Sequence, residues 1–282
     1  MGRTDQPARG ALLVTLAALM FATMGVLIRL ASAQLPNELV VFFRNLFGLL
    51  ILLPVILQRG DRLSLATRHP WLHLARSLFG LAAMYCFFFA LSELPLADAV
   101  LLNFTAPLFI PFVAVLWLRE RLTPRIALAI LIGFAGVLFI LKPGSGLYSR
   151  TALIGLASGA FAGVAMVVLR RLSATEPALR VVLYYGLICT SVSAVPLAWS
   201  WQTPALTPLA WLAAAGLFAT AGQYLLSWGY GYAPAAQIGP FTYAAVVFAA
   251  AYGWLFWHEQ PDALSVAGTV LVVVAGVLAM RR

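Results

Sequence analysis

Ten long apolar runs, separated only by short polar segments, limit what this chain can fold into. Each run is close to the roughly 20 residues that an α-helix needs to cross the hydrocarbon core of a bilayer. Hydrophobic residues make up 63% of the sequence and charged residues 10%, against about 45–50% and about 25% in a soluble domain. The runs lie near residues 10–31, 38–57, 72–92, 97–117, 124–141, 150–170, 180–200, 208–231, 236–257 and 263–280. The sequence therefore predicts an all-α membrane protein with ten transmembrane helices.

The two halves of the chain repeat each other. A shift of 139 positions aligns Tyr85 with Tyr224, Pro95 with Pro234, Phe109 with Phe248 and Glu120 with Glu259. The segment "RLASAQLP" at 29–36 returns as "RRLSATEP" at 170–177, and "AGVL" occurs at both 135–138 and 275–278. Internal repeats of this kind are typical of transporter folds. We expect two five-helix repeats, over residues 1–142 and 143–282.

Because five spans per repeat is an odd number, the second repeat must enter the membrane from the opposite side. The positive-inside rule tests this inversion, since it places Lys and Arg in cytoplasmic loops. With a cytoplasmic N-terminus, the inner segments hold Arg3, Arg9, Arg59, Arg62, Arg68, Arg119, Arg121, Arg125, Arg170, Arg171, Arg180, Arg281 and Arg282, whereas the outer segments hold Lys142 and Arg150, with Arg29 near a span end. The prediction is an inverted repeat in the inner membrane, with both termini in the cytoplasm.

Several motifs together resemble the EamA-type transporters of the drug/metabolite transporter superfamily. They are "VVFFRNLFGLL" with Arg44, "ALSELPLADAVLLNFTAPLFIPFVAVLWLRERLTP" with Pro107 and Glu120, "GYAPAAQIGPFTYAAVVFAAAYGWLFWHEQ" with Glu259, and the two "AGVL" segments. The resemblance covers nearly the whole chain. It implies a ten-helix carrier whose substrates are amino acids, other metabolites or drugs. The second repeat departs from the pattern with Val246 at the position of Pro107, so we expect the two halves to move differently.

Other function classes find little support in the residues. The net charge of +9 comes from arginines beside spans, where topology and anionic lipids explain them, so we expect membrane lipids and no nucleic acid as partners. The segment "HEQPD" at 258–262 lacks the second histidine of a zinc-protease helix, and "PGSGL" at 143–147 lacks the first glycine of a nucleophile elbow. We expect no enzyme activity, no metal and no cofactor.

Polar groups in the middle of a span are costly and commonly face a cavity. Pro107 and Pro111 withdraw backbone hydrogen bonds inside the span at 97–117, beside Asn103 and Thr105. The alternatives are a static kink and a moving cavity wall, and we favour the moving wall. The span at 236–257 carries Pro240, Thr242 and Tyr243, of which Thr242 is the repeat partner of Asn103.

Aromatic and amide side chains complete the predicted substrate site. Tyr224, Ser227 and Trp228 share one face of the span at 208–231, next to Gln223, and Tyr85 is the repeat partner of Tyr224. Aromatic residues at this spacing also serve as packing or as an interfacial belt, and both interpretations stay open.

Arg44 lies about 9 Å into the span at 38–57, given a rise of 1.5 Å per residue. Its side chain either extends to the outer surface toward Glu38 or binds a substrate carboxylate.

The sequence thus predicts an exporter of small amphipathic metabolites, most plausibly neutral or aromatic amino acids, that works by alternating access as a monomer or weak homodimer. Carboxylates fall at span ends, which favours gradient-driven or weakly coupled export. The alternatives are a drug or other-metabolite carrier of the same fold, and a membrane protein without transport, such as a lipid-modifying enzyme or an assembly subunit.

Overall fold

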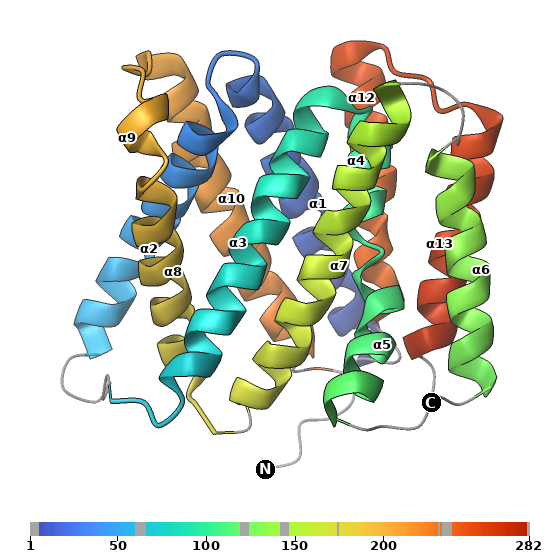
Figure 1. Cartoon of the computed structure of the whole chain (residues 1–282), viewed down its shortest axis with the longest axis horizontal. Coiled ribbons are helices and arrows are strands. Elements are labelled where there is room, and N and C mark those ends of the chain that lie inside the picture. Colours follow the sequence, from blue (N-terminus) through green and yellow to red (C-terminus); the bar gives the residue numbers. More distant parts are fainter. Residues whose placement is uncertain are drawn as a thin grey trace.

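The computed structural model describes residues 6–59, 66–118, 124–141, 147–173, 175–230, 232 and 239–280, and regular structure in these ranges is helical throughout (Figure 1). The elements are α1 (Pro7–Ser32), α2 (Asn37–Arg59), α3 (Pro70–Glu93), α4 (Leu96–Asn103), α5 (Ala106–Leu118), α6 (Pro124–Leu141), α7 (Leu147–Ser173), α8 (Ala178–Ala194), α9 (Leu197–Ser200), α10 (Leu206–Tyr230), the 3-10 helix η2 (Gly239–Tyr243), α12 (Ala244–Trp257) and α13 (Ala263–Met280).

Each predicted apolar run contains one helix or one broken pair of elements. The described part of the chain has 5 helices that are long and apolar enough to cross a membrane on their own. The other apolar helical segments are shorter, in part because three of the runs are interrupted. The breaks lie at Phe104–Thr105 between α4 and α5, at Val195–Pro196 between α8 and α9, and after η2.

The first break lies next to Pro107. The sequence predicts that Pro107 kinks a continuous helix, but in the structure a new helix begins at Ala106, so Pro107 occupies the first turn of α5. Proline is well tolerated there, because the N–H that it lacks would have no partner within the helix. Pro111 does lie inside α5, as predicted.

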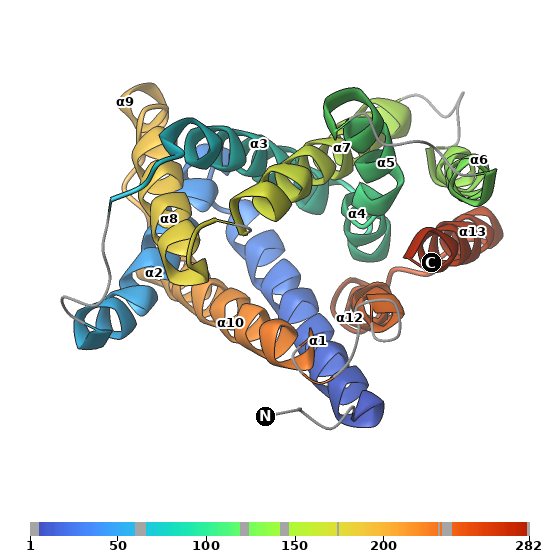
Figure 2. The ribbon, with the colours of Figure 1, turned by 90° about the horizontal axis from the view of Figure 1, so that it is seen from below.

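The helices pack mainly in pairs, shown from below in Figure 2. The most extensive contacts join α1 to α10, α3 to α7, and α6 to α13. Further contacts join α2 to α8 and α10, α8 to α3, α12 to α1 and α4, and α7 to α4 and α5. Figure 2 shows α6 and α13 at one side of the molecule and α2, α8 and α9 at the other.

This packing keeps the same pattern when the two halves of the chain are exchanged. Under the sequence repeat, α1 corresponds to α7, α2 to α8, α3 to α10, α4 with α5 to η2 with α12, and α6 to α13. The α1–α10 contact then becomes the α7–α3 contact, and α2–α10 becomes α8–α3. The pairs α2–α8, α4–α12 and α6–α13 map onto themselves. The helix packing thus has the organisation that a two-repeat architecture requires.

Glycines at every fourth position of α7 allow a close approach of α4 and α5. A Cβ on Gly155 would lie 2.8 Å from Leu102, and one on Gly159 would lie 2.6 Å from the Leu102 carbonyl oxygen. Gly163 faces Phe109 in the same way. The stripe Gly155, Gly159 and Gly163 is therefore a helix contact inside the bundle, against α4 and α5.

Candidate functional site

Two repeat-equivalent residues are in contact where α4 and α5 meet η2. Phe104, at the break between α4 and α5, packs against Tyr243, the last residue of η2, with 5.9 Å between ring centroids. Two residues in equivalent positions of a two-fold arrangement meet only on the axis that relates the two copies. In transporters built from repeats, the substrate site lies near this axis.

Two polar residues, Asn103 and Thr105, flank Phe104 at the break between α4 and α5. Asn103 donates a hydrogen bond from Nδ2 to Ser158 Oγ on α7 at 3.1 Å. The fully buried Thr105 hydroxyl donates to the Leu102 carbonyl at 2.6 Å, and the same carbonyl accepts the Thr105 backbone N–H at 3.2 Å. Asn103, a predicted site residue, thus lies at the break and is hydrogen-bonded to the second half of the chain.

Two of the predicted tyrosine hydroxyls are buried without a hydrogen-bond partner among the described residues. Tyr243 is 5% exposed and packs against Gly276 of α13, while Tyr85 on α3 is half-buried. Neither Oη atom has a partner among the described residues. A buried hydroxyl without a partner is unfavourable, so a bound solute that accepts or donates a hydrogen bond could complete either group. Thr242, next to Tyr243, is half-buried and has an interaction of its own.

The predicted α10 residues lie in a different environment. Tyr224 is 43% exposed and Trp228 is 62% exposed. Both share a face of α10 turned away from Gly222 and Gly229, which pack against α1. Gln223 is exposed as well and has a partner. The side chains of the remaining predicted residues, Ser227, Pro240 and Pro111, lie outside the described part of the structure.

The repeat therefore predicted equivalent environments for Tyr85 and Tyr224, but the two environments differ in the structure. Tyr85 packs against the main core, whereas Tyr224 is among the exposed aromatic residues.

The Arg44 side chain is held by Asn45 and does not pair with Glu38 at the outer surface. Its Nη1 donates to Asn45 Oδ1 at 3.3 Å, and its Nε is buried without a hydrogen-bond partner. Among the described residues, no ion pair joins Arg44 to Glu38. Arg44 is thus held inside the bundle with unused donor capacity.

One carboxylate connects the two halves of the chain at the end of the bundle opposite the start of α1. Glu259, just after α12, forms an ion pair with Arg29 of α1 at 2.6 Å. Its Oε2 also accepts the backbone N–H of Leu96, the first residue of α4, at 2.9 Å. Arg29 lies over the Trp257 ring, 4.4 Å from its centroid. We call Arg29, Trp257, Glu259 and the Leu96 N–H the end lock.

The chain turns sharply to bring Glu259 to this position. His258 adopts a left-handed conformation with φ of 55°, and it is the sole non-glycine residue with positive φ in the described ranges. The Glu259 carboxylate then lies over Gly253, where a Cβ would be 2.5 Å from Oε2. A side chain at Gly253 would displace the carboxylate, so the end lock depends on this glycine.

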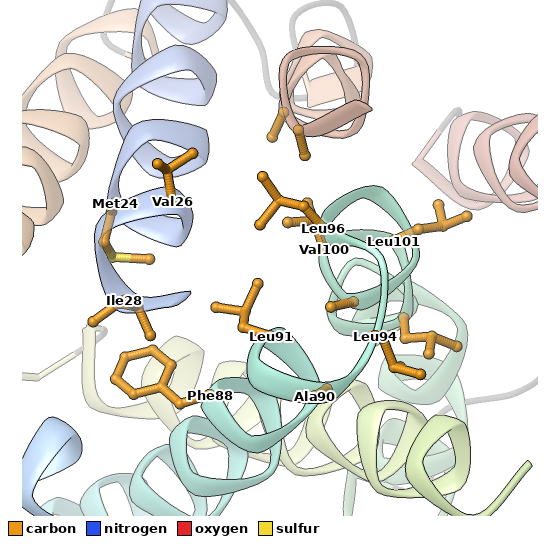
Figure 3. Close-up of a cluster of buried hydrophobic side chains, with 14 of the residues drawn as sticks. Met24, Val26, Ile28, Phe88, Ala90, Leu91, Leu94, Leu96, Val100 and Leu101 are labelled. Carbon is orange, nitrogen blue, oxygen red and sulfur yellow. The ribbon is translucent and has the colours of Figure 1, made fainter. Parts of the chain in front are cut away.

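Apolar side chains close the same end below the lock (Figure 3). Figure 3 shows Ile28 of α1 beside Phe88 of α3, Leu91 between this pair and Leu96 of α4, and Leu94 on the far side of Leu91 from Ile28. These five residues are each at most 2% exposed. Burial of this apolar contact, together with the ion pair, closes the bundle between α1, α3, α4 and α12.

The end lock could not be predicted from the sequence, because nothing local to Arg29 or Glu259 shows that α1 and α12 are neighbours. The one available signal was an arginine inside an apolar run. Glu120, the repeat partner of Glu259, lies outside the described residues.

Comparison with known proteins gives a family that agrees with this architecture. The model of the EamA-like transporter family matches residues 8–142 and again residues 149–281. Each half of the chain is thus one copy of the family's domain.

Curated relatives cover nearly the whole chain. A pseudopaline exporter of Pseudomonas aeruginosa (strain UCBPP-PA14) is 38% identical over 275 residues, which are 96% of this chain and 96% of the relative. A riboflavin transporter of Rhizobium johnstonii is 28% identical over 98% of this chain and 93% of its own length. An S-adenosylmethionine uptake transporter of Rickettsia bellii is 28% identical over 84% of this chain and 81% of its own.

A solved structure supports the fold. A protein described only as a crystal structure superposes with a TM-score of 0.67 at 22% identity, covering 97% of this chain and 98% of that one. At this identity the similarity concerns the fold alone. The two family matches and the 38% identical relative lead to one conclusion: the chain is a membrane transporter of the EamA-like transporter family.

Proposed function

We propose that the protein exports small amphipathic metabolites, with neutral and aromatic amino acids as the substrate class. The observation that carries this proposal is the central contact of Phe104 with Tyr243, which brings an interrupted element of each half together beside Asn103 and an unpaired tyrosine hydroxyl. Neutral hydrogen-bonding groups next to aromatic rings suit a solute with one polar end and one apolar end. Export as the direction is supported by the relative at 38% identity, which is named an exporter.

We extend the proposed site to the predicted residues. Tyr85, Asn103, Thr242 and Tyr243 line its centre, and Arg44 holds the polar end of the solute. Gln223, Tyr224, Ser227 and Trp228 contact the solute during passage along α10, and Pro107, Pro111 and Pro240 shape the moving elements. The chain needs no cofactor or metal in this proposal.

The proposed topology has ten spans, two inverted repeats divided near residue 142, and both termini in the cytoplasm. The first described helix begins and α13 ends at the same end of the bundle (Figure 1), which supports an even number of crossings. The end lock then faces the outside. Opening the lock, while the opposite end closes, would release the solute to the exterior.

Transport by purified protein in proteoliposomes tests the proposed substrate class. Vesicles loaded with unlabelled phenylalanine or leucine should accumulate the labelled amino acid by counterflow. Riboflavin and S-adenosylmethionine, the substrates named for two relatives, serve as competing cargo. Exchange of either of these without exchange of any amino acid would show that the proposed substrate class is wrong. Absence of all exchange would favour a membrane protein without transport.

Site variants in the same assay test the assignment of residues. Tyr243→Phe keeps the ring against Phe104 and removes only the unpaired hydroxyl, so it should lower the exchange rate without loss of folded protein. Tyr224→Ala should lower it as well, through loss of aromatic surface. Normal exchange by both variants would place the solute elsewhere.

A further inference from the structure

A second arginine lies beside the groups that surround Arg44. Arg76 of α3 is positioned over the ring of Tyr185 of α8, with Cζ 4.5 Å from the ring centroid. Both side chains fit against Gly80, where a Cβ would lie 2.5 Å from Arg76 Nη1 and 2.8 Å from the Tyr185 ring. One turn above Tyr185, Cys189 contacts the Ser77 carbonyl oxygen at 3.6 Å.

Arg44 of α2 and Arg76 of α3 belong to helices that both pack against α8. Arg76 lies over the ring of Tyr185, and a Cβ on Gly186, the next residue of α8, would lie 3.1 Å from Leu49 of α2. Both guanidinium groups lie near Tyr185 and Cys189. Three helices thus bring two positive charges to one place inside the bundle. We call Arg44, Asn45, Arg76 and Ser77 the arginine cluster.

The arginine cluster has more donors than acceptors. Four of its polar atoms are buried without a hydrogen-bond partner among the described residues: Arg44 Nε, Arg76 Nε, Asn45 Nδ2 and Ser77 Oγ. Asn45 is 3% exposed and Ser77 is 1% exposed, so bulk water does not reach them freely. Among the described residues, no ion pair joins Arg44 or Arg76 to a carboxylate.

Two carboxylates elsewhere in the described structure are paired with other arginines. The two ion pairs found there are Arg29–Glu259 and Arg180–Glu176. An arginine inside a membrane protein is normally paired or marks a substrate path, and an unpaired buried charge is strongly unfavourable. Two such arginines with unused donors at one place therefore point to an anion that arrives from outside the chain.

We propose that Arg44 and Arg76 together bind the carboxylate group of the transported solute, between α2, α3 and α8. This inference rests on the proposed transport function, to which it adds the chemical group that is recognised. An ionised carboxylate offers about four lone-pair sites on two oxygens, which matches the four unused donors. Arginine forks bind carboxylates and phosphates with two parallel hydrogen bonds, but a phosphate has more oxygens to satisfy than a carboxylate and more than the four unused donors can serve.

Binding to the purified protein in detergent tests the inference without any transport step. The readout is the shift of the thermal unfolding midpoint with millimolar glutarate, with its neutral analogue glutaramide, or with inorganic phosphate. We expect glutarate to raise the midpoint of the wild type and glutaramide to leave it unchanged. An equal shift with glutaramide, or a shift with phosphate and none with glutarate, would overturn the carboxylate assignment.

Variants then assign the binding to the cluster. Arg44→Gln and Arg76→Gln should each weaken glutarate binding by at least about tenfold, because each removes one charged fork. Arg68→Gln, at an exposed position before α3, is the matched control and should bind as the wild type does. Wild-type affinity in Arg76→Gln would overturn the two-arginine site.

Lysine and methionine variants test the site if a glutamine variant does not fold. Arg44→Lys and Arg76→Lys keep the charge and lose the fork, so each should fold and bind glutarate more weakly than the wild type. Without ligand, Arg76→Met should unfold at the same temperature as the wild type or higher, since it removes an unpaired buried charge. A lower midpoint together with unchanged glutarate binding would show that Arg76 is a structural residue.

Transport separates this inference from the proposed function. Phenylalanine should exchange in proteoliposomes and phenylalaninamide, which lacks the carboxylate, should not. Equal exchange of both would overturn the carboxylate site while transport itself stands. Glutarate binding lost in Arg44→Gln and Arg76→Gln, with no exchange of any amino acid, would leave the site standing and remove the proposed substrates.

Discussion

At the residue scale, Glu259 joins three elements through one carboxylate. It pairs with Arg29 and accepts the Leu96 N–H, and a hydrogen bond to a charged group contributes about 1.5–3 kcal/mol. Glu259→Gln keeps the shape and removes the charge. We expect it to shift the equilibrium toward the state that is open at this end, by roughly 10- to 100-fold.

Distances between spin labels on Ala33 and Gln260, two exposed residues at this end, would report the shift. The population with a longer distance should grow in Glu259→Gln. Glu93→Gln, an exposed carboxylate at the end of α3, is the matched control. Identical distance distributions in Glu259→Gln and the wild type would show that the ion pair does not hold the end closed.

A second residue-scale prediction concerns pH. The pKa of Glu176, between α7 and α8, lies below its usual value of 4.5, because its carboxylate accepts a hydrogen bond from Thr67 and is paired with Arg180. A carboxyl group with a lowered pKa stabilises the folded state above its unfolded-state pKa. That stabilisation is lost as the pH falls through the lowered folded-state value.

Thermal unfolding of purified protein measured from about pH 7 down to about pH 3 tests this sign. The wild type should lose stability steeply at the acid end, and Glu176→Gln should be less stable at neutral pH and lose less on acidification. Glu93→Gln should follow the wild type. Parallel curves for Glu176→Gln and the wild type would contradict the prediction.

At the scale of elements, the contact of α7 with α4 and α5 controls the geometry of the central site. A Cβ on Gly159 would lie 2.6 Å from the Leu102 carbonyl, while a Cβ on Gly48 of α2 would meet nothing within 4 Å. Gly159→Ala should therefore destabilise the protein by about 1–3 kcal/mol through overpacking. Gly48→Ala makes the same chemical change in open space and should be neutral or slightly stabilising.

Chemical unfolding of the two glycine variants in mixed micelles measures the difference. Because the Gly159→Ala clash falls at the break beside Asn103, amino acid exchange should fall with it. Equal stability of the two variants would mean that α7 can move away from α4 without loss of free energy.

At the scale of the whole molecule, the arrangement of arginines predicts the side on which the chain ends. Alkaline phosphatase, which is active outside the cytoplasm, and a fluorescent protein that folds in the cytoplasm can be fused to the C-terminus of the full chain and to an N-terminal extension. We expect fluorescence and no phosphatase activity at both ends. Phosphatase activity at either end would contradict the ten-span topology.

Much of the architecture follows from the sequence because it depends on local composition and on comparison of the chain with itself. The apolar runs indicated the helices, and the repeat of the two halves agrees with the two family matches at 8–142 and 149–281. The repeat indicated that Phe104 and Tyr243 are equivalent, and the structure brings them into contact beside Asn103, whereas Tyr224 and Trp228 occupy an exposed face of α10. The role of these residues in binding stays a prediction.

The tertiary structure alone decided which side chains meet between helices. Arg29 and Glu259 are 230 positions apart, and Arg44 and Arg76 belong to different spans, so no periodicity or motif could bring either pair together. Hydrophobicity is a property of each segment and determines which segments enter the membrane. Pairing of charges and donors depends on how the helices are placed against one another, and that placement follows from packing over the whole bundle.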